Sequence, residues 1–282
     1  MDPLVTTQWL ADHLGDSDLR VLDASYTSTI PGAPPGNPRA SYLAGHVPGA
    51  LYLDLDDLVD PDAPLPSTVP PAVRFLSRMR ALGVGDGSRI VLYDDVPHKT
   101  ACRAWWLFRL FGVEKVAILD GGLAAWKAER RPLASGEERR RERHFTLLDP
   151  RAELRTLGEM KALVADGGTQ ILDARSPARF NGAETDPRPG VAPGHMPGAT
   201  NLPYGGFFEA DGRWKRGPAL RAVFDAAGVD LDRPMVATCG SGITAAAIVF
   251  AAHLLGRDAA LYDGSWSEWG ADPETAKETG TK

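Results

Sequence analysis

The chain contains the same series of short motifs twice, which constrains its fold more than any other feature. In order, first copy against second, these are VLDA at 21–24 and ILDA at 171–174, GHVPGA at 45–50 and GHMPGA at 194–199, IVLY at 90–93 and MVAT at 235–238, and DGG at 120–122 and DGS at 263–265. The offset between copies drifts only from 150 to 143 residues while the order is kept. Chance would not keep both, so we expect two copies of one domain.

Each copy alternates short apolar runs with helix-like stretches. The apolar runs are too short for helices and are typical of buried strands: 20–23, 116–119, 170–173 and 259–262. Two helical stretches, 104–111 and 244–255, are each followed by a glycine that can end a helix. This alternation predicts an α/β fold of two tandem domains, each a mainly parallel central sheet flanked by helices. Ligands of such sheets bind beyond the carboxyl ends of the strands.

The boundary between the copies falls in a charged stretch. Residues 136–143 are nearly devoid of apolar side chains, so we expect an exposed linker at 136–152 between a first domain, 1–135, and a second, 153–282. Glutamates interrupt the arginines of this stretch and no aromatic residues interleave with them, which favours a solvated linker over a nucleic-acid patch. A Pro- and Gly-rich stretch at 30–38 predicts a surface loop.

Composition and charge exclude several classes of protein. The formal net charge of −6 gives no reason to expect nucleic acid or an anionic membrane as a partner. No apolar run approaches the roughly 20 residues of a membrane helix, and the start of the chain lacks the pattern of a secretory signal, so we expect a cytoplasmic protein. Two cysteines do not make a disulfide framework, and no cysteines or histidines stand at zinc spacings, so we expect neither metal nor cofactor.

The segment around Cys239 carries the chemistry. A predicted strand runs into Cys239, Gly240 and Gly242 follow, and a helix begins near Thr244. Glycines let several backbone N–H groups turn toward one point, and a helix N-terminus adds unpaired donors. Such a cradle would stabilise the thiolate, which is the nucleophilic form of cysteine. A cysteine that only packs at a strand end gains nothing from a Gly-Ser-Gly turn, so we interpret Cys239 as a nucleophile.

The first copy provides the contrast. Asp94 stands where the second copy has Cys239, so the first domain lacks the nucleophile and is expected to form part of the cleft wall. Cys102 enters an apolar helix, where packing is the better interpretation. His46 and His195 recur in both copies although only one has the cysteine, which indicates a structural role in a hydrogen-bonded turn.

These features together resemble a known family. The duplication, the paired Gly-His-x-Pro-Gly-Ala blocks, the cysteine loop and the closing YDGSWSEW at 262–269 are similar to the tandem-domain rhodanese-like sulfurtransferases. The uncharged loop Cys-Gly-Ser-Gly-hydrophobic-Thr resembles the branch that uses 3-mercaptopyruvate, whereas the branch that uses thiosulfate carries a basic pair there. The resemblance implies a persulfide on Cys239, an acceptor that is a thiol, cyanide or a thioredoxin-like dithiol, and substrate binding by Gly240, Gly242, Ile243 and Thr244.

The resemblance also assigns residues outside the loop. Arg179 and Arg188 match the two arginines that hold the carboxylate and carbonyl of mercaptopyruvate, a planar two-pronged task that suits guanidinium groups. Arg175 follows a strand aspartate and is expected to form a structural ion pair. The family's Asp-His-Ser relay maps to Asp54 and Ser241.

The relay of this chain lacks its histidine. That position falls on Ser67, so either water and Ser67 replace it or His98 of the first copy reaches in.

Three alternatives stay open to different degrees. Thiosulfate could be the donor in place of mercaptopyruvate. A rhodanese-like domain could also be a binding module without activity, although Cys239 and the glycine turn speak against that. A cysteine phosphatase needs an arginine six positions after the cysteine, where this chain has Ala245.

Overall fold

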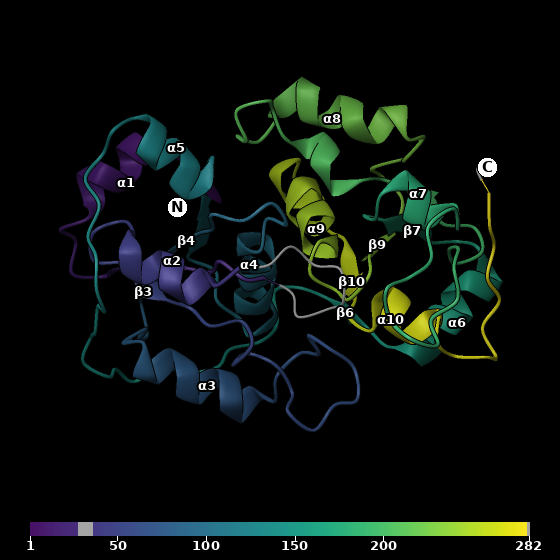
Figure 1. The fold of residues 1–282 in the computed structure, drawn as a ribbon, viewed down its shortest axis with the longest axis horizontal. Helices are drawn as coiled ribbons and strands as arrows, with labels where there is room; N and C mark the ends of the chain where they lie inside the picture. Colours follow the sequence, from purple (N-terminus) through teal and green to yellow (C-terminus); the bar gives the residue numbers. More distant parts are fainter. Residues whose placement is uncertain (28–35, 281–282) are drawn as a thin grey trace.

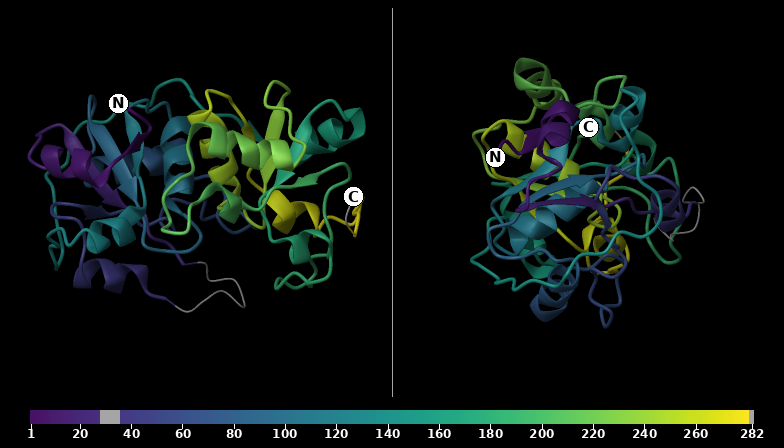
Figure 2. Two further views of the ribbon diagram at one scale, coloured as in Figure 1. Left: turned by 90° about the horizontal axis from the view of Figure 1, so that it is seen from above. Right: turned by 90° about the vertical axis from the view of Figure 1, so that its left-hand side faces the viewer.

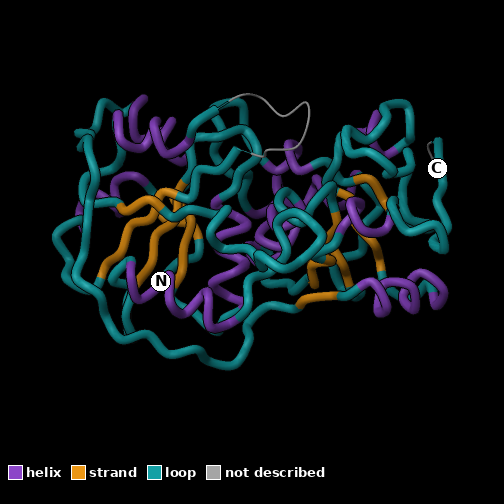
Figure 3. Tube along the Cα trace, turned by 60° about the horizontal axis from the view of Figure 1, so that its bottom comes forward, coloured by secondary structure: helices purple, strands orange, loops and turns teal. Residues whose placement is uncertain are grey.

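The computed structural model describes residues 1–27 and 36–280, so most of the predicted 30–38 loop lies outside the described residues. It contains two five-stranded sheets (Figures 1 and 3), ordered β1-β5-β4-β2-β3 and β6-β10-β9-β7-β8. All pairings between neighbouring strands are parallel. The same order occurs in both copies, which confirms the predicted tandem α/β fold.

The elements follow the same succession in each copy. The first copy contains β1 (Leu4–Val5), α1 (Thr7–His13), β2 (Leu19–Asp23), α2 (Pro38–Ala44), β3 (Leu51–Tyr52), α3 (Ala72–Ala81), β4 (Arg89–Tyr93), α4 (Ala101–Leu110), β5 (Val116–Leu119) and α5 (Gly122–Ala128). The second contains β6 (Leu154–Arg155), α6 (Leu157–Asp166), β7 (Gln170–Asp173), α7 (Pro177–Phe180), β8 (Thr200–Asn201), the 3-10 helix η1 (Tyr204–Phe207), α8 (Gly217–Ala226), β9 (Met235–Thr238), α9 (Ala245–Leu254), β10 (Ala260–Tyr262) and α10 (Ser265–Trp269).

The predicted elements lie close to the observed ones. The runs at 116–119 and 170–173 are β5 and β7, and the helix predicted from 104 begins three residues earlier as α4. Gly112 and Gly256 follow α4 and α9 with φ of +88° and +70°, so both helices end in the left-handed conformation that glycine adopts without strain.

The two copies meet through the helices that follow their central strands. α4 and α9 pack against each other between the two sheets (Figures 1 and 2). The ring of Trp105 meets that of Phe250 edge-on at 4.9 Å between centroids. One apolar core continues from the first sheet through these helices to the second. This shared core holds α9, and with it the loop between β9 and α9, against the first copy.

Most residues of the predicted linker are exposed, and Phe145 is the main exception. No helix or strand occurs over 136–152, but Phe145 is buried and its ring lies 6.2 Å from that of Phe75. The backbone N–H of Asp86 donates to the carbonyl of His144. Phe145 thus attaches the charged linker to the first copy, because burial of its ring removes apolar surface from water. The exact domain boundaries stay a prediction. Among the described residues, no helix has the length and apolar character needed to cross a membrane.

Candidate active site

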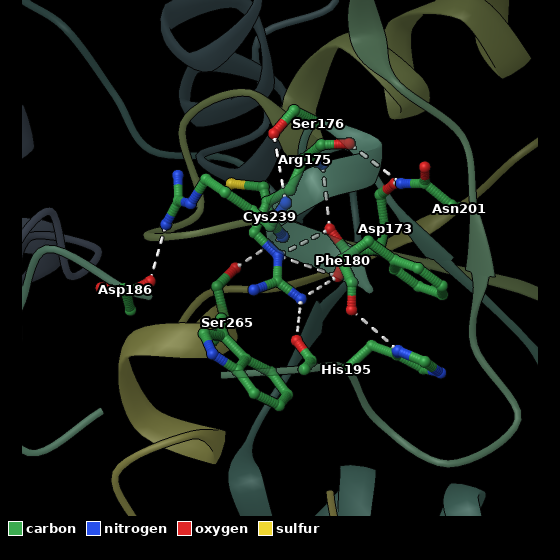
Figure 4. A network of polar contacts seen from close by, with 12 residues as sticks. Asp173, Arg175, Ser176, Phe180, Asp186, His195, Asn201, Cys239 and Ser265 are labelled. Atoms are coloured by element: carbon green, nitrogen blue, oxygen red, sulfur yellow. Dashed lines mark hydrogen bonds and ion pairs between the residues drawn. The ribbon is translucent and has the colours of Figure 1, made fainter. Parts of the chain in front are cut away.

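Cys239 directly follows β9, at the carboxyl end of a central strand. Its side chain is 2% exposed. Its backbone N–H donates to Ser265 Oγ at 3.2 Å (Figure 4). Its carbonyl accepts from the N–H of Trp266 at 3.0 Å. The carbonyl of Gly240 accepts from Ser267 in the same way. The repeated Asp-Gly motif and the first turn of α10 therefore hold the backbone at Cys239 and Gly240.

The loop from Gly240 to Ala245 presents unused donors. Within the part of the chain that the structure describes, none of its backbone N–H groups donates a hydrogen bond. Gly242 has φ of +79°, and a Cβ there would lie 2.9 Å from the carbonyl oxygen of Asp263. α9 begins at once, with Thr244 as its N-cap and Ile243 at the edge of the core. A row of free N–H groups at a helix N-terminus is a setting that binds an anion.

Arg179 and Arg188 lie beside this loop, as the sequence predicts. A Cβ on Gly240 would lie 3.0 Å from Nη2 of Arg188 and 3.3 Å from Nη2 of Arg179, so both guanidinium groups closely approach the loop at this glycine. Asp186, which is buried, binds both: its carboxylate lies 2.7 Å from Arg179 and 3.0 Å from Arg188. Burial lowers the pKa of Arg188, an effect that the charge of Asp186 opposes. The three side chains form a fixed cluster with a net charge of +1.

Arg175 forms the structural ion pair expected of it. Its Nη2 lies 2.6 Å from Asp173 (Figure 4). It also donates to the carbonyl of Gly194, and the guanidinium lies over the ring of Trp266, 4.5 Å from the ring centre. His195 Nδ1 lies 2.9 Å from the carbonyl of Phe180, and the two rings stack. These contacts brace the segments around the cysteine loop.

The first copy has a carboxyl group at the matching place. Asp94 follows β4 and is buried, and burial raises its pKa to about 6 although Lys99 acts against this. Cys102 lies beside Asp94 and is 1% exposed. Burial raises the pKa of its thiol well above the ordinary value. Cys102 thus packs in the core, as predicted.

The predicted relay residues are not joined by hydrogen bonds. Ser241 is buried beside Cys239 in the chain. Asp54 is exposed, and its carboxylate accepts from the N–H of Asp56. Ser67 does reach the loop, because it lines a small cavity together with Ile243. His98 lines a different cavity, formed with Ser25, Ser41, Asp95 and other residues of the first copy alone, so the structure offers nothing in favour of its reaching Cys239.

Sequence reasoning missed three residues of this site. Asp186 stands two residues before Arg188, and that proximity was the one available signal for it. Ser265, in the repeated Asp-Gly motif, accepts the N–H of Cys239. Arg103 of the first copy donates a hydrogen bond to the carbonyl of Gly242 at 3.3 Å. The two residues are 139 positions apart, so no local sequence pattern could have indicated this contact.

Comparison with known proteins now identifies the family. The model of the family described as "Rhodanese-like domain" matches residues 6–129 and again residues 156–272, which together make up most of the chain. The chain belongs to the rhodanese-like family. The resemblance noted from the motifs is therefore confirmed, together with its tandem arrangement.

Rhodanese-like relatives match the chain over nearly its whole length. The 3-mercaptopyruvate sulfurtransferase of Escherichia coli strain K12 is 40% identical over 95% of this chain and 94% of its own. The thiosulfate sulfurtransferase of Bos taurus is 37% identical over 96% and 94%. The crystal structure of SseA from Escherichia coli, described under 3-mercaptopyruvate sulfotransferases, superposes with a TM-score of 0.85 at 36% identity, covering 95% of this chain and 100% of its own.

Proposed function

We propose that the chain is a sulfurtransferase that takes sulfur from 3-mercaptopyruvate, carries it as a persulfide on Cys239 and passes it to a thiol, cyanide or thioredoxin-like acceptor. One observation carries this proposal: a cysteine at the end of a central strand is followed by a row of backbone N–H groups with no partner among the described residues. The names of the relatives, several of which are sulfurtransferases, agree with it. A cytoplasmic location, inferred from the sequence, is part of the same proposal.

The reaction is a double displacement at sulfur. The Cys239 thiolate attacks the sulfur of mercaptopyruvate, the S–S bond forms, the C–S bond breaks, and its electron pair leaves with pyruvate as the enolate. An acceptor thiolate then attacks the outer sulfur, takes it as a persulfide and regenerates the Cys239 thiolate. The N–H groups from Gly240 to Thr244 stabilise the persulfide anion as an oxyanion hole stabilises oxygen.

The charge of the arginine cluster favours mercaptopyruvate over thiosulfate. Two guanidinium groups and one carboxylate leave a net charge of +1, which matches a donor with a single carboxylate better than a dianion. Arg179 and Arg188 hold the carboxylate and the ketone oxygen by charge-assisted hydrogen bonds. Thiosulfate is the second candidate donor, since a thiosulfate sulfurtransferase is also a relative of this chain.

The enolate of pyruvate must gain a proton. We assign Ser241 to this step because its hydroxyl lies in the loop, two residues from Cys239, and is mostly shielded from solvent. Asp54 is assigned to the same relay by resemblance to the family. Ser67 stands in the histidine's place and lies next to Ile243 of the loop. Water with Ser67 therefore replaces the histidine in this proposal.

Steady-state sulfur transfer to cyanide tests the function. The rate of thiocyanate formation is measured with mercaptopyruvate and with thiosulfate for the wild type and two matched variants, Cys239→Ser and Cys102→Ala. We expect a larger kcat/KM with mercaptopyruvate, no activity in Cys239→Ser and full activity in Cys102→Ala. A larger kcat/KM with thiosulfate would overturn the donor, and inactivity with both donors would favour a binding module.

A further inference from the structure

Arg103 is a buried cation outside the predicted site. It lies in the first turn of α4, 2% exposed, with its guanidinium 4.8 Å from the ring centre of Trp106. A charge removed from water to this extent requires partners that satisfy it. Its partners come from separate segments of the chain, so the role of Arg103 follows from which segments it connects.

The guanidinium of Arg103 contacts both copies. It donates to the carbonyl of Ser67 at 2.5 Å and to the carbonyl of Gly242 at 3.3 Å, and it forms an ion pair with Asp263 at 2.8 Å. The second oxygen of Asp263 accepts the backbone N–H of Val69 at 2.7 Å. The loop that carries Ser67 is thus tied to the cysteine loop through a single side chain.

The contact with Gly242 bears on the row of free donors. A trans peptide unit is planar, so its N–H points opposite to its carbonyl. When Arg103 holds the carbonyl of Gly242, it fixes the direction of the N–H of Ile243 on the other side of the same peptide. That N–H is one of the donors in the loop that follows Cys239 and has no hydrogen-bond partner among the described residues. Arg103 therefore fixes the orientation of one free donor of the loop through the carbonyl side of its peptide unit.

We propose that Arg103 is a positioning residue: through the Gly242 carbonyl it aims the Ile243 N–H at the sulfur of Cys239. The first copy, which has no nucleophile, thereby contributes to the chemistry of the second. The proposal rests on the proposed sulfurtransferase function and assigns to that function a residue from the other domain.

The duplication supplies a matched control. Asp120 holds the place of Asp263 in the first copy and makes the reverse contacts, accepting the N–H of Trp214 at 2.8 Å and pairing with Arg216 at 3.0 Å. Arg216→Gln therefore breaks an ion pair between the copies that touches neither Cys239 nor its loop. Arg216 is half-exposed whereas Arg103 is buried, so Arg216→Gln controls for the loss of an ion pair between the copies, and the sign of the change in alkylation rate distinguishes an aimed donor from a loosened loop.

The rate of alkylation of Cys239 by iodoacetamide, measured against pH, tests the proposal without any sulfur donor. We expect Arg103→Gln to slow alkylation at pH 7 about tenfold, because the loss of one aimed donor weakens the thiolate cradle. Arg216→Gln should match the wild type. A merely structural role predicts the opposite sign, since a loosened loop would expose Cys239 and speed alkylation, so an unchanged or faster rate in Arg103→Gln overturns the proposal.

Two further measurements separate the possible outcomes. Arg103→Lys keeps the positive charge but loses the planar guanidinium group with its several N–H donors. We expect this variant to fold and to show an intermediate alkylation rate. It replaces Arg103→Gln in the test if circular dichroism shows that Arg103→Gln is unfolded. With mercaptopyruvate, kcat should fall about tenfold in Arg103→Gln while KM stays within about threefold. If the wild type alkylates as expected but transfers no sulfur, the function fails while the role of Arg103 in the loop stands.

Discussion

Asp94 and Cys239 occupy the same place in the two copies, yet their loops are satisfied differently. Each follows the central strand, and the carbonyl of each accepts an N–H from the motif after the last strand, from Leu123 and from Trp266 respectively. The carboxylate of Asp94 accepts the backbone N–H of Ala101 at 2.8 Å, so the first copy fills its own anion cradle. In the second copy, none of the backbone N–H groups from Gly240 to Ala245 donates a hydrogen bond within the described residues.

Replacing Asp94 should change how stability depends on pH. Burial raises the pKa of Asp94 to about 6, above its ordinary value of 3.8, so the folded state favours the protonated form. Stability from this group is present below pH 4 and is lost as the pH rises through 6, by about 3 kcal/mol in all. We expect Asp94→Asn to be more stable relative to the wild type at pH 7 than at pH 4. The free energy of unfolding of both proteins, measured by urea titration at the two pH values, checks this. A difference independent of pH would contradict the buried, raised carboxyl.

Removing either arginine should impair the reaction with mercaptopyruvate. Each variant, Arg179→Ala or Arg188→Ala, loses charge-assisted hydrogen bonds worth about 1.5–3 kcal/mol, or roughly 10- to 150-fold in kcat/KM. Arg213→Ala, on the surface of the second copy, serves as the control and should match the wild type. Wild-type values for both arginine variants would exclude these residues from substrate binding.

The carboxylate of Asp186 should set the preference between donors. Asp186→Asn keeps the shape of the side chain but raises the net charge of the arginine cluster from +1 to +2. A dianion gains more than a monoanion from the added charge, so the ratio of kcat/KM for thiosulfate to that for mercaptopyruvate should rise about tenfold, or 1.4 kcal/mol. A ratio that stays the same would mean that charge does not decide between the donors.

Alanine variants of Gly242 and Gly256 distinguish the effect of backbone strain from the effect of a displaced cysteine loop. Both have positive φ, but a Cβ at Gly242 meets the carbonyl oxygen of Asp263 at 2.9 Å, whereas no atom of the described residues lies within 4 Å of one at Gly256. Gly256→Ala should cost about 1–2 kcal/mol of stability because of the left-handed conformation, and Gly242→Ala should cost more because of the added clash. Only Gly242→Ala should also reduce kcat. Equal activity in the two variants would show that the turn after Cys239 tolerates displacement.

The sequence predicted what is repeated and local. The duplicated motifs indicated two identical sheets, and the glycines after Cys239 indicated a loop that opens a helix. The contacts that complete the site could not be predicted, because they depend on tertiary packing. Arg103 meets Asp263 only because the two copies pack together through α4 and α9. Asp186 pairs with Arg179 and Arg188 within the second copy, through a conformation of the 179–188 segment that no motif specified.

The relay was the least predictable part of the site. Asp54 matched by motif alone, and in the structure its carboxylate is exposed and faces its own turn, so its role stays a prediction. Side chains on loops take their direction from tertiary contacts that a single sequence does not contain. Ser67, at the position where the family resemblance expects a histidine, lines a small cavity together with Ile243 of the cysteine loop, and its role in the relay also stays a prediction.

Mass spectrometry after treatment with one equivalent of mercaptopyruvate tests the central claim most directly. We predict that the intact protein gains one sulfur atom, that peptide mapping places this atom on Cys239, and that pyruvate is released in equal amount. Cys102→Ala should gain the same atom and Cys239→Ser should not. A wild-type protein that releases no pyruvate and carries no added sulfur on Cys239 would contradict the persulfide mechanism.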